Sequence, residues 1–271
     1  MGMHYIGIVV LGLALLPHSA VGSDDAVPES SVRTSAMPPS APALAAEPSQ
    51  SHTASGVKRA DFARVTASRD VRQIADWIVD SGDNRNLPFV IVDKTDARVF
   101  VFGAGGRIQG AAPALVGLTR GDDTIPGIGD RELSDMPPET RTTPAGRFVA
   151  ALGMSTRGVD ILWVDYEAAI SLHRVINTNP KERRLERLAS PTPLDKRISY
   201  GCINVPARFY ENVVRPAFTG TDGIVYVLPE TRPARVVFGS YDVEARVWHL
   251  SAEQALQHTT ITGAMTVRQP R

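Results

Sequence analysis

The run RISYGCINVP, residues Arg197–Pro206, carries the features that decide the fold and chemistry of this chain. Its Cys202 is the only cysteine among 271 residues, and Gly201 directly precedes it. Glycine permits a tight turn that a residue with a Cβ resists. Such a turn can present a thiol and align successive backbone N–H groups as an oxyanion hole. The run therefore predicts a cysteine nucleophile held on a turn.

An apolar segment near the N-terminus predicts export. Ile6–Leu16 is uncharged and too short to span a bilayer, as is typical of a signal-peptide core. Ala20-Val21-Gly22 supplies small residues for cleavage, which predicts a signal peptide over residues 1–22. Met1–Tyr5 lacks lysine and arginine, so an uncleaved membrane anchor is the alternative. In an oxidising compartment, an unpaired Cys202 favours a chemical role over that of a small buried hydrophobe.

The rest of the chain divides by composition and periodicity. Residues 23–58 are rich in alanine, serine and proline and predict a flexible linker. Asp70–Asp80 has helical apolar spacing, ended by Ser81-Gly82, and predicts a helix within an N-terminal segment over 59–84. A catalytic domain is expected over 85–230, followed by a C-terminal extension over 231–271.

After Pro88 the pattern changes to short β-rich runs, of which Phe89–Asp93 and Val99–Phe102 predict a hairpin. A helix is expected over Pro206–Val214. Further strands are expected at Arg107–Gly110, Gly146–Leu152, Ile161–Val164, Ala168–Leu172, Ile224–Leu228, Val236–Gly239 and Val243–Leu250. The predicted fold class is α+β and β-rich, with an N-terminal helix.

A cysteine nucleophile needs a base, because the thiolate is the reactive form. Three of the six histidines fall in the predicted signal peptide or linker, and the others are His173, His249 and His258. His173 follows a strand-like run upstream of the cysteine, whereas the other two lie near the C-terminus. A lone histidine is more often structural, but the single exported thiol favours His173 as the base.

The pattern from His173 to Ser199–Asn204 (SYGCIN) resembles the L,D-transpeptidase (YkuD-like) signature of histidine, spacer, Ser-His-Gly-Cys, an aliphatic residue, and Asn or Arg. Arg141–Phe148 (RTTPAGRF) resembles the Thr-Pro-x-Gly-x-Phe strand entry of these domains. The similarity covers about Leu87–Pro229. It implies a β-sandwich-type catalytic domain that transfers acyl groups of peptidoglycan stem peptides through a cysteine thioester. An amine acceptor, which could belong to a wall protein, or water then resolves the thioester.

The resemblance also implies residue roles. Cys202 is the nucleophile and His173 the general base and acid, oriented by the backbone carbonyl of Arg174. Backbone N–H groups would form the oxyanion hole, and they belong to Tyr200, Gly201 and Cys202. The side chains of Ser199 and Asn204 would support the turn or contact substrate.

Two features depart from the signature. Tyr200 stands where histidine is usual, and tyrosine cannot act as a base near neutral pH. The spacer from position 174 to 198 is longer than usual, and its extra part, Asn177–Asp195, is either a lid or specificity insertion or surface decoration. Two alternatives therefore stay open: a hydrolase of the same fold (an L,D-carboxypeptidase or an enzyme that cleaves wall–protein bonds), and a catalytically weak peptidoglycan-binding module.

Several other functions are not expected. Lysine plus arginine equals aspartate plus glutamate, 29 against 29, which gives no electrostatic basis for a nucleic-acid partner. No His-Glu-x-x-His, paired cysteines or aspartate-rich loop predicts a metal site. The glycine cluster Gly103–Gly106 lacks the strand-to-helix context of a phosphate-binding loop, so no nucleotide cofactor is expected.

Overall fold

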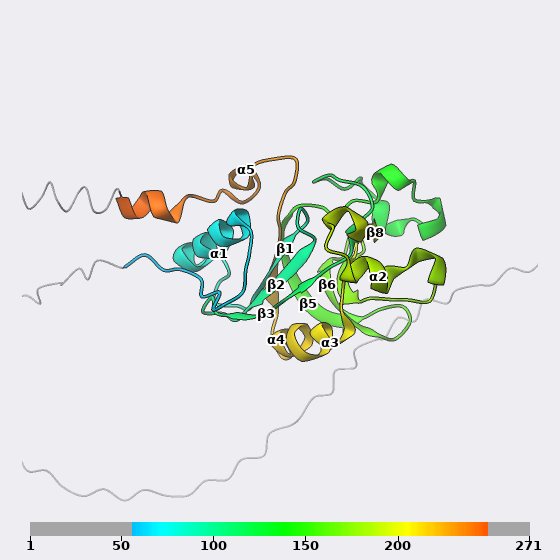
Figure 1. Cartoon of the computed structure of the whole chain (residues 1–271), viewed down its shortest axis with the longest axis horizontal. Coiled ribbons are helices and arrows are strands. Elements are labelled where there is room, and N and C mark those ends of the chain that lie inside the picture. The colour runs from blue at the N-terminus through cyan, green and yellow to red at the C-terminus, as the bar shows by residue number, and fades with distance from the viewer. Residues whose placement is uncertain (1–55, 249–271) are drawn as a thin grey trace, which may run out of the picture. The chain divides into compact units, whose positions relative to one another are not determined.

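The computed structural model describes residues 56–248 (Figure 1). The predicted signal peptide, most of the predicted linker, His249, His258 and the end of the C-terminal extension lie outside the described residues. Within 56–248, no helix has both the length and the apolarity needed to cross a membrane.

Eight strands form one mixed sheet in the order β3-β2-β1-β10-β5-β6-β7-β9. Their bounds are β1 Phe89–Asp93, β2 Arg98–Phe102, β3 Ile108–Pro113, β5 Gly146–Met154, β6 Asp160–Asp165, β7 Ile170–Arg174, β9 Ile203–Val205 and β10 Gly223–Val227. The pairs β1–β10 and β7–β9 are parallel, and the other neighbours are antiparallel. A separate parallel pair joins β4 Val116–Gly117 to β8 Arg197–Ser199. The predicted β-rich α+β class and the β1–β2 hairpin are confirmed.

The helices are short apart from the first. Their bounds are α1 Arg69–Ser81, α2 Arg184–Ala189, α3 Ala207–Phe209, a π-helical turn Tyr210–Val214, α4 Arg215–Phe218 and α5 Ala234–Phe238. Short 3₁₀ turns span Ile128–Asp130, Leu133–Asp135, Pro138–Thr140, Pro180–Glu182 and Pro193–Lys196. The predicted first helix is confirmed: Ser68 caps its start by accepting from the N–H of Val71, and Gly82 ends it with φ 70°.

Strand alternation gives the sheet two buried faces. On one face, Phe89, Ile91 and other odd-numbered residues of β1 pack with apolar residues of α1. On the other face, Val90 and Val92 pack with the segment that follows the cysteine, through Tyr210 and its neighbours. Figure 1 shows α1 and the α3–α4 segment on opposite sides of these strands. The second core also takes side chains from β6, β7 and β9, so the sheet curls around it and brings the β7–β9 end toward the loop after β3.

The two strands predicted near the C-terminus are wrong. Val236–Gly239 falls mainly in α5, and the described part of Val243–Leu250, residues 243–248, is helical. Pro233 precedes α5 and Gly239 ends it with φ 67°, which are helix-boundary signals that outweigh the β propensity of two valines. Strands β4, β8 and β9 were not predicted, because two or three residues are too few to show a period.

Candidate active site

Cys202 lies in the turn between β8 and β9, as the sequence predicts. Gly201 has φ 131°, a backbone conformation that side chains rarely permit. A Cβ added at Gly201 would lie 2.7 Å from the carbonyl oxygen of Thr142 and 2.6 Å from Cδ1 of Ile170. The turn therefore requires glycine directly before Cys202.

A buried threonine braces this turn. The hydroxyl of Thr143 donates to the carbonyl oxygen of Gly201 at 2.7 Å and accepts from the N–H of Gly117 at 2.9 Å. Thr143 is 1% exposed, so both bonds are shielded from water. This contact gives the Thr-Pro part of the RTTPAGRF run a local role: it holds the turn that carries Cys202.

The strand register brings the predicted base, His173, near Cys202. In the parallel pair of β7 and β9, Leu172 lies opposite Ile203 and His173 opposite Asn204. One step earlier, the same register places Ser171 beside Cys202. Because side chains alternate along a strand, Ser171 and His173 share the face opposite to the core residue Leu172. The structure thus brings together Cys202, His173 and Ser171.

The imidazole of His173 is oriented by the backbone. Its Nδ1 lies 2.7 Å from the carbonyl oxygen of Arg174. A carbonyl can only accept, so Nδ1 carries the hydrogen and Nε2 is left as the basic nitrogen. This is the orientation that the sequence resemblance implies for a general base.

Arg174, which supplies this carbonyl, is held in place by its own side chain. Its guanidinium donates to the carboxylate of Asp160 at 3.0 and 3.2 Å and to the backbone oxygen of Asp160 at 2.8 Å. It also pairs with Glu211 and lies 4.1 Å above the ring of Tyr210. These contacts tie β7, β6 and the helical segment together behind His173.

The cysteine and histidine shift each other toward an ion pair. Burial alone would raise the pKa of the Cys202 thiol, but the contact and charge of His173, with donors from Ser171, together lower it. Burial alone would lower the pKa of His173, but its interactions with Cys202 and its bond to Arg174 raise it above its ordinary value. Both directions favour a thiolate beside an imidazolium.

Sequence reasoning missed Ser171, whose hydroxyl contacts the sulfur of Cys202 at 3.6 Å. A serine within a strand is common, and nothing in its type marks it as functional. The available signal was its position two residues before His173, since period-two spacing puts both side chains on one face of β7.

The other predicted site residues surround the turn. The ring of Tyr200 lies 4.1 Å from the guanidinium of Arg141. Ser199 is 2% exposed and accepts from the N–H of Gly201 at 3.1 Å, while Asn204 is 1% exposed and donates to the carbonyl oxygen of Cys202 at 3.1 Å. For Ser199 and Asn204, these contacts favour support of the turn over contact with substrate.

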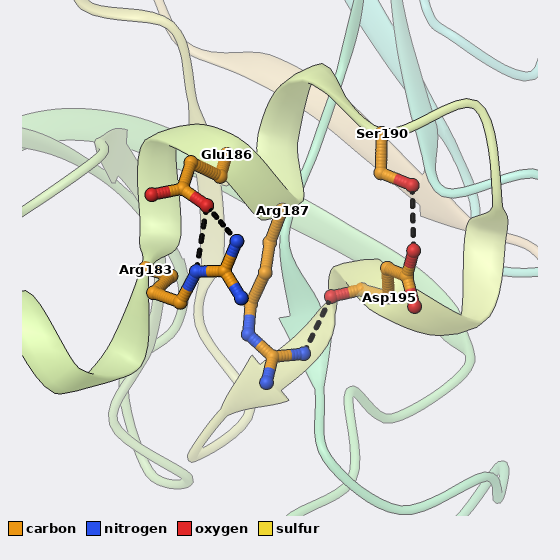
Figure 2. Close-up of a pocket in the computed structure, with 5 residues that line it drawn as sticks. All are labelled: Arg183, Glu186, Arg187, Ser190 and Asp195. Carbon is orange, nitrogen blue, oxygen red and sulfur yellow. Dashed lines mark hydrogen bonds and ion pairs between the residues drawn. The ribbon is translucent and has the colours of Figure 1, made fainter.

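The long spacer folds into α2 and its flanking turns. A pocket of about 330 Å³ on this insertion is lined by Arg183, Glu186, Arg187, Ser190 and Asp195 (Figure 2). These residues pair with one another, as the dashed lines in Figure 2 show. Arg183 pairs with Glu186, Ser190 with the carboxylate of Asp195, and Arg187 with the backbone oxygen of Asp195. The pocket is thus part of the internal framework of the insertion.

Arg184 links the insertion to the turn that carries Cys202. Its Nη1 donates to Oδ1 of Asn204 at 2.8 Å, and the amide of Asn204 donates in turn to the Cys202 carbonyl oxygen. The Arg184 side chain is 12% exposed. The residues between His173 and the cysteine are therefore attached to the site rather than remote from it.

Arg184→Leu should lower the free energy of unfolding by about 1–3 kcal/mol, because the buried oxygen of Asn204 loses a charged donor. Urea denaturation measures the difference. Arg183→Leu is the matched control, since Arg183 is 69% exposed in its pair with Glu186 and such pairs contribute little. Equal stability of the two variants would show that the link to Asn204 does not hold the insertion.

Among the described residues, no group of three or more His, Cys, Asp or Glu side chains is placed to hold a metal ion.

No protein-family model and no curated protein matches this sequence. Among solved structures, the chain is similar to the helical cell shape determining protein Pgp2 from Campylobacter jejuni, with 15% identity and a TM-score of 0.37. That match covers 65% of this chain and 60% of Pgp2. It is also similar to a cysteine-to-serine variant of Enterococcus faecium L,D-transpeptidase, with 14% identity and a TM-score of 0.29. That match covers 52% of this chain and 49% of the transpeptidase. At these TM-scores the likeness assigns neither a family nor an activity to this chain.

Proposed function

We propose that this chain is an L,D-transpeptidase-like cysteine acyltransferase that acts on peptidoglycan stem peptides. The observation that carries the proposal is the pairing of the only cysteine with an imidazole whose other nitrogen is bound to a backbone carbonyl. A reactive thiol, a base and a group that orients the base are the components of nucleophilic acyl transfer. The sequence signature around Ser199–Asn204 supports the substrate class.

In the proposed reaction, the Cys202 thiolate attacks a carbonyl carbon of the stem peptide, and the carbonyl oxygen becomes an oxyanion. His173, protonated at both nitrogens, gives the Nε2 proton to the leaving amine as the C–N bond breaks. A thioester remains on Cys202. An amine or water then attacks the thioester, with His173 accepting its proton, and the thiolate is released.

Backbone N–H groups of the turn would stabilise the oxyanion. Of the three donors that the sequence suggests, the N–H of Gly201 is already bound to the hydroxyl of Ser199. The proposal therefore assigns the oxyanion to the N–H groups of Tyr200 and Cys202. Tyr200 would act through its backbone, because its ring lies against Arg141.

A hydrolase of the same fold is the second candidate, and the link from Arg184 to Asn204 favours it. That bond holds the insertion beside the nucleophile turn, where it would restrict the approach of a large amine more than that of water. In either case we propose that the protein acts in the cell envelope after export. Its substrates would be stem peptides, and an amine-bearing wall protein is an alternative acceptor.

Incubation of the full chain with tetrapeptide muropeptides tests the proposal by mass spectrometry. The expected result is a thioester adduct on Cys202 with loss of the terminal residue of the stem. Crosslinked products would then indicate transfer, and tripeptides alone would indicate hydrolysis. Absence of the adduct and of both products, with the protein folded, would contradict the proposal.

The role of His173 predicts a pH profile. The alkylation rate of Cys202 should have a midpoint below the free-thiol pKa of about 8.5, because the pKa of this thiol is lowered. His173→Ala should move the midpoint upward, since it removes the imidazolium that favours the thiolate. Rates with iodoacetamide across pH measure both. An unchanged midpoint would remove His173 from this role.

A further inference from the structure

We propose that Ser171 is a third catalytic side chain, whose hydroxyl donates a hydrogen bond to the anionic sulfur of Cys202. This role rests on the proposed acyl transfer and adds a donor that the sequence signature does not contain. It is carried by the geometry of β7, the contacts of the sulfur and the shape of the turn before β7.

The sulfur of Cys202 contacts both a donor and an acceptor. The hydroxyl of Ser171 is a donor 3.6 Å from Sγ, and the backbone N–H of Ser171 also acts on the sulfur. The carbonyl oxygen of Ala169 lies 3.5 Å from Sγ and can only accept. A neutral thiol can therefore donate to Ala169, whereas a thiolate can accept from Ser171 and His173.

The hydroxyl of Ser171 is well placed to donate to the thiolate. Ser171 is 4% exposed, so water does not compete strongly for its hydroxyl. The parallel register sets Ser171 beside Cys202, and His173 lies two residues further along β7, so the sulfur lies near donors from two residues on the same face of β7.

The backbone before β7 is held in an unusual conformation. Ala169 has φ 53°, in the left-handed region that an alanine enters at an energetic cost. Its carbonyl is the one that faces the sulfur. A strained residue beside a nucleophile is consistent with a segment shaped around the site.

The ionisable groups acting on this sulfur and its base are few. His173 acts directly on Cys202, and Arg184 acts on His173 by opposing its protonation. The hydroxyl of Ser171 stays neutral at every pH of the alkylation assay, so it would favour the thiolate throughout.

Alkylation of the full-length protein with iodoacetamide across pH tests the proposal. Ser171→Ala should raise the midpoint by about one pH unit, which is about a tenfold loss of reactivity below the midpoint. Ser171→Thr, which retains a hydroxyl, should restore the lower midpoint. Ser134→Ala, at an exposed serine on a 3₁₀ turn, should leave the profile unchanged.

The assay uses no wall substrate, so its outcome is independent of whether the chain processes stem peptides. A midpoint that stays in place in Ser171→Ala, while His173→Ala moves it, would overturn the role of Ser171 and leave the proposed function standing. If Ser171→Ala does not fold by circular dichroism, Ser171→Gly also removes the hydroxyl and is judged by the same shift.

Discussion

Cys202→Ala is expected to abolish both covalent labelling and turnover. Cys202 is the only thiol in 271 residues, so each chain should carry one adduct with a thiol reagent or with an acylating carbapenem-type inhibitor. The variant removes the atom that would form the proposed thioester, and no other side chain at the turn can replace a thiolate. Intact-mass measurement of the adduct and muropeptide analysis give the two readouts.

Cys202→Ser is the companion variant, because it keeps a side chain of similar size on the turn. Its hydroxyl is a much weaker nucleophile near neutral pH, so it should also lose turnover while keeping the thermal stability of the parent. Full activity in either variant would end the assignment of Cys202 as nucleophile.

Lys94→Met is expected to produce the largest loss of stability. The Lys94 ammonium is fully buried and bonds the carbonyl oxygen of Thr143 and the carboxylate of Asp122, each at 2.9 Å. Burial lowers the pKa of Lys94, while its carboxylate neighbours act to raise it. Removing the cation leaves Asp122 and Glu230 buried beside an apolar side chain, which should lower the unfolding free energy by about 3–5 kcal/mol.

The loss should also reach the active site, because Thr143 binds Lys94 through its carbonyl and Gly201 through its hydroxyl. Urea denaturation measures the stability, and alkylation of Cys202 in the folded protein reports on the turn. Lys181→Met is the control, since Lys181 is exposed on the insertion. Equal stability of the two variants would show that the arginine partners of these carboxylates, Arg197 and Arg232, balance their charges without Lys94.

The parts of the fold that could be predicted are those with a strong local pattern. The apolar spacing of Asp70–Asp80 and the two runs of the β1–β2 hairpin identify their elements directly. In contrast, β8 and β9 contain three residues each and owe their strand conformation to neighbours distant in sequence. The C-terminal valines were misassigned because packing and helix-boundary residues override the preference of Val236 for strands.

For the site, the sequence identifies groups whose chemistry is rare. Cys202 is the single thiol. His173 is the predicted base because it follows a strand-like run upstream of the cysteine. Ser171, Arg184 and Lys94 were not identified, because their importance comes from partners that folding brings near. Their residue types are common, and only the strand register or the buried contacts distinguish them from others of the same kind.

The parallel pairing of β7 with β9 has a consequence for how substrate binds. His173 lies on β7 and Cys202 directly precedes β9, so the two residues are positioned by the pairing of these strands, which are about 4.8 Å apart, rather than by a long loop. Backbone hydrogen bonds of such a ladder are expected to open rarely, which would hold the two residues in place before any ligand binds. Under the proposed function, these two groups would therefore be preorganised, and the binding energy of the stem peptide would remain available for orienting its carbonyl.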